Sequence, residues 1–178
     1  MKASKVSSDH PYHNLPENPE SDYKIQLTKN WLKQIVIDLE LCPFANRVYK
    51  SNEISYKPLD NLDPEKILIQ LKLEMGRIEN TKVTTSLLIL NQCSFDRFMD
   101  LLDVCEEFLQ LFDSEKEFQL AHFHPQYQFA DTSEKDISNF TNRSPYPIIH
   151  ILPTDEVSKA IESYDDIHSV PKRNIKFM

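Results

Sequence analysis

The chain contains almost no glycine. Gly76 is the only glycine in 178 residues, whereas a chain of this length usually carries roughly 12. Walker A loops, Rossmann fingerprints, kinase glycine-rich loops and GxSxG nucleophile elbows each need at least two closely spaced glycines. The sequence excludes all of these site classes. Turns that need a positive φ must use Asn or Asp instead.

Signals for export, membrane insertion and disulfide bonding are also lacking. Residues 1–20 are polar and broken by prolines, which predicts a flexible tail rather than a signal peptide. No apolar run is long enough to span a bilayer. The three cysteines have no CxxC spacing, so neither a disulfide framework nor a zinc finger is indicated. We therefore expect a cytoplasmic protein with no membrane partner, and one domain over residues 21–178.

The charge balance is acidic. With 20 basic and 28 acidic residues the net charge is −8, and a nucleic-acid-binding protein should instead show a basic footprint. We therefore expect no nucleic-acid partner. The apolar content of 40% is that of a folded globule rather than a disordered chain.

The hydrophobic pattern predicts alternating helices and strands. The predicted helices cover residues 21–41, 64–78, 94–112, 133–140 and 155–164, with a further one from 171 onward. The predicted strands cover residues 53–58, 83–90, 117–124 and 148–152. This order favours an α/β domain, with α+β as the alternative. We expect a four-stranded, mostly parallel or mixed sheet flanked by about four helices, whose last strand is antiparallel to the third.

Cys42 precedes Pro43, and its chemistry depends on the helix to which it belongs. At the end of the first helix, the negative end of the helix dipole would disfavour a thiolate. As the N-cap of a short helix that begins at Pro43, the thiol would have a lowered pKa and could act as nucleophile or ligand. A purely structural cysteine is the third interpretation.

Three histidines lie on two of the predicted strands. On a strand, His122 and His124 project to the same face, and such an HxH pair can ligate a metal together with His150. A divalent metal at this position requires His150 to share that face. The alternative is that each ring bonds to a backbone carbonyl.

The connection between the last two strands is long and stiffened by proline. In the segment Ser144-Pro145-Tyr146-Pro147, each proline holds its predecessor in an extended conformation. A long connection of this kind is usually a lid or a binding loop. Arg143 offers a planar fork for a carboxylate or phosphate, and Tyr127 and Tyr146 could stack on a ligand. The alternative is an arginine that braces the loop through backbone carbonyls.

These segments resemble a bacterial family known as domain of unknown function 1415. The matching segments are Trp31, LCPFA at 41–45, TTSLL at 84–88, FHPQYQF at 123–129, TNRSPYP at 141–147, and His150. The resemblance implies no established activity. It does mark Cys42, His124, Tyr127, Arg143, Tyr146 and His150, and it adds Asn142 and Ser144. His122 does not fit the family pattern.

The leading functional hypothesis is a small soluble enzyme, or former enzyme, that acts on a small anionic metabolite by hydrolysis or group transfer. His124 or His150 would be the general acid or base, Cys42 the nucleophile, and Arg143 the anion clamp. Asn142, Ser144, Tyr127 and Tyr146 would help to bind the ligand. One alternative is a non-catalytic ligand- or peptide-binding module that uses the 144–147 segment. Another is metal binding by Cys42, His124 and His150. The sequence does not specify a cofactor or an oligomeric state.

Overall fold

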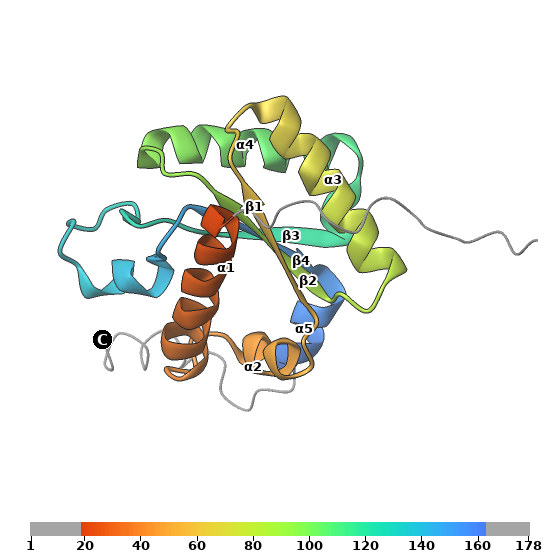
Figure 1. Ribbon diagram of the computed structural model, residues 1–178, viewed down its shortest axis with the longest axis horizontal. Coiled ribbons are helices and arrows are strands. Elements are labelled where there is room, and N and C mark those ends of the chain that lie inside the picture. The colour runs from red at the N-terminus through yellow and green to blue at the C-terminus, as the bar shows by residue number, and fades with distance from the viewer. Residues whose placement is uncertain (1–18, 163–178) are drawn as a thin grey trace, which may run out of the picture.

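The computed structural model describes residues 19–162, which form one α/β domain (Figure 1). The helices are α1 Pro19–Trp31, α2 Pro43–Lys50, α3 Pro64–Asn80, α4 Phe95–Leu111 and α5 Thr154–Glu162. The short helical segments are η1 Leu32–Ile37, η2 Ser114–Lys116 and η3 Ile137–Asn142, and the strands are β1 Ile54–Leu59, β2 Thr85–Leu90, β3 Phe118–Phe123 and β4 Ile148–Pro153. Most of the predicted tail and the predicted helix from residue 171 lie outside the described residues.

The sheet is mixed, with the strand order β1-β2-β4-β3. β1 and β2 are parallel, whereas β4 is antiparallel to both of its neighbours. The expected antiparallel pairing of the last two strands is confirmed. Of the two expected arrangements the mixed sheet is confirmed, because the connection after β3 folds back and inserts β4 in the reverse direction between β2 and β3.

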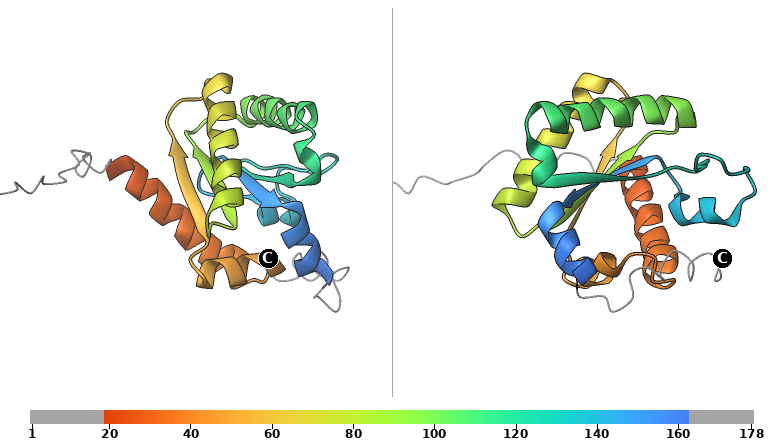
Figure 2. Two further views of the ribbon diagram at one scale, coloured as in Figure 1. Left: turned by 90° about the vertical axis from the view of Figure 1, so that its right-hand side faces the viewer. Right: turned by 180° about the vertical axis from the view of Figure 1, so that it is seen from behind.

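Helices cover both faces of the sheet (Figures 1 and 2). α3 and α4 pack on one face, called the α3/α4 face below, over an apolar cluster that includes Leu88, Ile149 and Ile151. α1, α2 and α5 lie on the other face, the α1/α2 face, over clusters that include Leu87, Ile148 and Leu152. Side chains alternate along a strand, so Ile149 and Ile148 belong to different layers of the core.

The predicted first helix over residues 21–41 is too long. The α-helix ends at Trp31, and a π-helical segment with i→i+5 hydrogen bonds follows, such as that from Leu41 N–H to the Val36 carbonyl at 2.8 Å. The β-branched run Ile35-Val36-Ile37 lowers helix propensity at this point. Glu40 then reverses the chain at φ 52°. Because no glycine is available there, a residue with a side chain takes the left-handed conformation.

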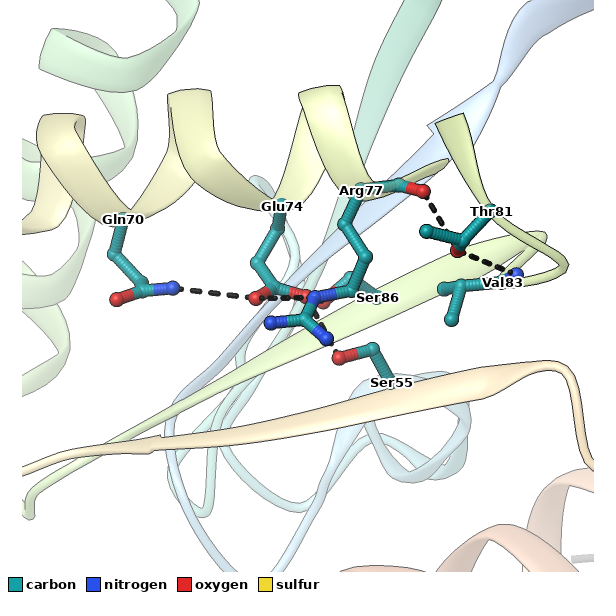
Figure 3. A network of polar contacts seen from close by, with 7 residues as sticks. All are labelled: Ser55, Gln70, Glu74, Arg77, Thr81, Val83 and Ser86. Atoms are coloured by element: carbon teal, nitrogen blue, oxygen red, sulfur yellow. Dashed lines mark hydrogen bonds and ion pairs between the residues drawn. The ribbon is translucent and has the colours of Figure 1, made fainter. Parts of the chain in front are cut away.

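A buried carboxylate fastens α3 to the sheet (Figure 3). Glu74 is fully buried, and its Oε2 accepts hydrogen bonds from Ser55 Oγ at 2.7 Å and Ser86 Oγ at 2.8 Å. Its Oε1 accepts from Gln70 Nε2 and Arg77 Nε, each at 3.2 Å. Four donors satisfy the buried charge, so the α3/α4 face tolerates a carboxylate in its core.

A buried lysine fixes α1 on the opposite face. The Lys24 ammonium is buried and donates to Asp60 Oδ1 at 2.7 Å and also to the side-chain oxygen of Asn91. Asp60 follows β1 and Asn91 follows β2. These two contacts tie α1 to the carboxyl ends of the parallel strand pair.

Candidate functional site

The strand register separates the histidines that the sequence grouped together. Ala121 of β3 pairs directly with His150 of β4, whereas His122 pairs with Ile149. Because side chains alternate along strands, His122 and His150 lie on opposite faces of the sheet. The predicted site of three imidazoles is therefore not formed.

The other predicted metal site is also not formed. His124 packs against Phe98 of α4, with ring centroids 5.3 Å apart, and so lies on the α3/α4 face. Cys42 and His150 belong to the α1/α2 face. Within residues 19–162, no three His, Cys, Asp or Glu side chains are grouped so that they could hold a metal ion.

His124 is held by the backbone at both ring nitrogens. Nε2 lies 3.1 Å from the Cys93 carbonyl, and Nδ1 accepts from the Gln126 N–H at 3.0 Å. This pattern fixes a neutral ring with its proton on Nε2. Burial lowers the pKa of His124, which further favours the neutral form. His124 therefore anchors the turn after β3, and neither nitrogen is left for acid–base chemistry.

Tyr127 pairs with His122. Its hydroxyl lies 2.8 Å from His122 Nε2, and the two rings stack with centroids 5.4 Å apart. Tyr127 is buried, and Phe95 and Phe129 pack edge-on against its ring. Tyr127 is thus an interior residue of the loop between β3 and β4, and its hydroxyl forms a hydrogen bond inside the protein.

Arg143 braces the long loop. Its Nε donates to the Tyr127 carbonyl at 3.3 Å, and its Nη2 donates to the Glu134 carbonyl at 2.8 Å. The guanidinium also lies over the Phe140 ring, 4.5 Å from its centroid. Arg143 therefore braces the loop through backbone carbonyls, as the alternative interpretation of the sequence required. These carbonyls occupy some of the guanidinium N–H donors that an anion would need.

The remaining loop residues also make internal contacts. Asn142 Nδ2 donates to the His122 carbonyl at 3.2 Å, and the buried Ser144 Oγ donates to the Tyr146 carbonyl at 2.5 Å. Tyr146 is half-buried against the α1/α2 face. The Trp31 indole donates to the Arg143 carbonyl at 2.8 Å, so this loop is fastened to α1.

Cys42 is the N-cap of α2, as one of the sequence interpretations required. Its backbone is extended at φ −136°, and Pro43 is the first helical residue. Burial raises the pKa of the Cys42 thiol, although the backbone amides of Ala45 and Phe44 lower it in part. The expected lowering of the pKa is wrong in sign, because desolvation outweighs the helix terminus. Cys42 is a neutral thiol at neutral pH.

His150 is set in one tautomer by Thr85. The Thr85 Oγ1 lies 2.6 Å from the Ile151 carbonyl oxygen and 2.7 Å from His150 Nε2. A hydroxyl has one proton, and the short contact with the carbonyl requires it. The Thr85 oxygen must therefore accept from His150 Nε2–H, which leaves Nδ1 as the basic nitrogen of the ring. No residue in the described part of the chain hydrogen-bonds to this Nδ1.

Desolvation by burial lowers the pKa of His150 to about 4. The imidazole is therefore neutral at physiological pH and is able to accept a proton at Nδ1. Sequence reasoning did not identify Thr85. The available signal was the pair of polar residues, Thr85 and Ser86, that begins a strand whose remainder is apolar, beside the strand that carries His150.

Cys42 lies over the part of the sheet that carries His150. Cys42 packs against two apolar clusters whose members surround His150 on all sides. These are Ile148 and Leu152 along β4, and Leu87 and Ala121 on the neighbouring strands. Cys42, Phe123 and His150 are each half-buried rather than fully buried on the α1/α2 face.

A family model described as "Protein of unknown function (DUF1415)" matches residues 24–178. The chain belongs to this family. No curated protein and no solved structure matches the chain significantly. Membership in DUF1415 confirms the resemblance drawn from the sequence motifs, and the functional argument rests on the geometry of the site.

The motifs of this DUF1415 chain have two different roles in the fold. The 123–129 and 141–147 segments are joined by hydrogen bonds from the His124 N–H to the Asn142 carbonyl and from Arg143 Nε to the Tyr127 carbonyl, and they brace the loop between β3 and β4. The 41–45 segment and His150 both belong to the α1/α2 face instead. None of the described helices is long and apolar enough to cross a membrane. The best candidate site is therefore the pair Cys42 and His150, with Thr85 behind the imidazole.

Proposed function

We propose that this chain is a small enzyme that transfers or hydrolyses an acyl group, with the thiol of Cys42 as nucleophile and His150 as general base. The observation that carries the proposal is the free Nδ1 of a neutral, half-buried His150 on the face that also carries the half-buried Cys42. A general base needs one ring nitrogen without a proton. A partner that accepts a hydrogen bond from the other ring nitrogen fixes this tautomer. Thr85 takes that orienting position.

The acyl transfer needs no cofactor. As the Cys42 sulfur bonds to the acyl carbon, its proton moves to His150 Nδ1, and the carbonyl electrons move to the oxygen. In this proposal the amide of Phe44, which lies beside the Cys42 sulfur in the first turn of α2, donates to that oxygen. The imidazolium then protonates the leaving group, and water or an acceptor alcohol or amine cleaves the thioester by the reverse sequence.

Both groups are neutral in the resting protein, and this affects how the thiol is activated. Burial raises the pKa of Cys42 and lowers that of His150, so a resting thiolate–imidazolium pair is disfavoured. Proton transfer must therefore accompany attack on the substrate. A substrate that brings negative charge close to His150 would raise the imidazole pKa and assist the transfer, in agreement with the expected small anionic substrate.

A panel of p-nitrophenyl esters and acyl thioesters of short mono- and dicarboxylic acids tests the proposal on the full chain. Cys42→Ala and His150→Gln should each abolish turnover of any substrate found, because glutamine keeps a donor toward Thr85 but has no basic nitrogen. Cys93→Ala, which removes the other half-buried thiol, should retain turnover. Equal turnover in Cys42→Ala and the unsubstituted chain excludes the proposed nucleophile.

One observation favours a second function, a peptide-binding module. Ile137 and Phe140 of η3 expose 46% and 44% of their surface on the loop that Arg143 braces. Exposed apolar side chains on a rigid loop are suited to a partner protein. Replacing both residues with serine should leave turnover intact and abolish partner binding, which distinguishes this function from the enzyme.

A further inference from the structure

A groove of about 510 Å³ lies at the end of the sheet where β1 and β2 begin and β4 ends. Its volume falls in the range of small-molecule sites. It is lined by Arg47, Glu53, Ile78, Thr81, Lys82, Val83, Thr84, Pro153 and Glu156. These residues come from α2, α3, α5, the end of β4 and the segments that precede β1 and β2 (Figure 1).

Both carboxylates of the groove already have partners. Glu156 lies 2.6 Å from Arg47 Nη2 and 3.1 Å from Lys159 Nζ. Hydrogen bonding from Lys159, together with the charge of Arg47, lowers the pKa of Glu156 and keeps it ionised. Glu53 accepts from the Thr84 hydroxyl at 2.8 Å and lies 3.6 Å from Arg47. The groove therefore offers no free carboxylate to a cation.

The groups of the groove that remain available to a ligand are positively charged. Lys82 lines the groove and is exposed, and no residue within 19–162 pairs with its ammonium. Arg47 leaves 53% of its side chain exposed, so its guanidinium can bind a further acceptor beside Glu53 and Glu156. Two cationic donors thus converge on a groove in a chain whose net charge is −8.

We propose that this groove binds the carboxylate or phosphate group of a small molecule. Lys82 is the primary contact, Arg47 is the second, and the apolar side chains of Ile78, Val83 and Pro153 receive the carbon skeleton. The sequence had placed an anion at Arg143, whose donors bond to loop carbonyls instead. The groove requires neither Cys42 nor His150, so it stands apart from the proposed acyl chemistry.

Amide NMR of the ¹⁵N-labelled full chain tests the site directly. Sodium phosphate and sodium succinate are titrated separately, with sodium chloride keeping the ionic strength constant. A saturable shift of the amides of residues 81–84 supports the site, and the anion that gives the tighter curve identifies the preferred group. The absence of a saturable shift with both anions overturns the proposal.

Substitutions of opposite sign make the test specific. Lys82→Gln should weaken binding about fivefold, and Glu53→Gln should tighten it about threefold, because one removes a cation and the other an anion. The glutamine at 53 can still accept from Thr84. Lys72→Gln removes an exposed lysine of α3 outside the groove and should change nothing. Equal affinity in Lys82→Gln and the unsubstituted chain also overturns the proposal, and the test requires no catalytic activity.

Discussion

Thr85 and His150 form a hydrogen bond in which the histidine is the donor. Their Oγ1 and Nε2 atoms are 2.7 Å apart, and the hydroxyl proton of Thr85 is already directed to the Ile151 carbonyl oxygen at 2.6 Å. One contact therefore determines which nitrogen of the His150 ring carries the proton. It makes Nδ1 the only basic atom that His150 can offer to a ligand.

The tautomer of His150 is the first prediction. Long-range ¹H–¹⁵N NMR correlations should show the proton on Nε2 in the unsubstituted chain and in Thr85→Ser. In Thr85→Val the Nε2–H loses its acceptor, and the free energy of unfolding should fall by about 1–3 kcal/mol. A proton found on Nδ1 in the unsubstituted chain contradicts the assignment.

Stability should decrease as the solution becomes mildly acidic. The pKa of His150 is about 4 in the folded chain, below its ordinary value of 6.5, so the unfolded chain binds a proton first as pH falls. The stabilisation by neutral His150 is therefore complete above about pH 6.5 and is lost progressively down to pH 4. Between about pH 7.5 and pH 5 the loss should be about 2 kcal/mol.

His150→Gln is the control for this pH dependence. Urea unfolding at the two pH values should show a drop in stability that is about 2 kcal/mol smaller in the variant than in the unsubstituted chain. His122 and His124 also have pKa values lowered by burial, and they contribute equally to both proteins. An identical drop in the two proteins would mean that His150 is not desolvated.

Glu74 should be essential for the stability of the α3/α4 face. Glu74→Ala leaves four donors without an acceptor and opens a cavity, so urea unfolding should show a loss of about 3–5 kcal/mol. Glu79→Ala removes an exposed carboxylate from the same helix and should change stability by less than about 0.5 kcal/mol. A similar small effect at both positions is inconsistent with the network of Figure 3.

Arg143→Ala should loosen the loop and leave the sheet intact. The substitution removes two hydrogen bonds to backbone carbonyls and the contact with Phe140, so amide hydrogen exchange should accelerate over about residues 127–143. Arg143→Lys should give an intermediate result, because an ammonium cannot reproduce the fork. Unchanged exchange in Arg143→Ala would exclude the bracing role.

Local sequence patterns identified where helices begin, whereas the orientation of the strands depends on tertiary pairing. Asp63 and Pro64 mark the start of α3, because an N-cap side chain and a proline at N1 act within one turn. The position of Cys42 as an N-cap was likewise one of the alternatives that Pro43 allowed. The orientation of β4, by contrast, depends on how a long loop returns. No local signal determines that return.

The same limit explains the site. Whether His150 shares a face with His122 depends on strand register, and a shift of one residue would reverse the answer. The sign of the Cys42 pKa shift depends on burial by the sheet and by α5, which are distant in the sequence. Motif residues such as His124 and Arg143 looked chemically active, yet they serve the loop, because backbone carbonyls and amides compete for the same side-chain nitrogens.

The most direct test of the Cys42–His150 site is the location of the acyl group during turnover. Intact-mass analysis of acid-quenched protein, followed by peptide mapping, should find one acyl adduct on Cys42 and none on Cys93 or Cys105. The adduct should form far more slowly in His150→Gln. An adduct on a different residue, or one that forms on Cys42 at the same rate in His150→Gln, would contradict the account.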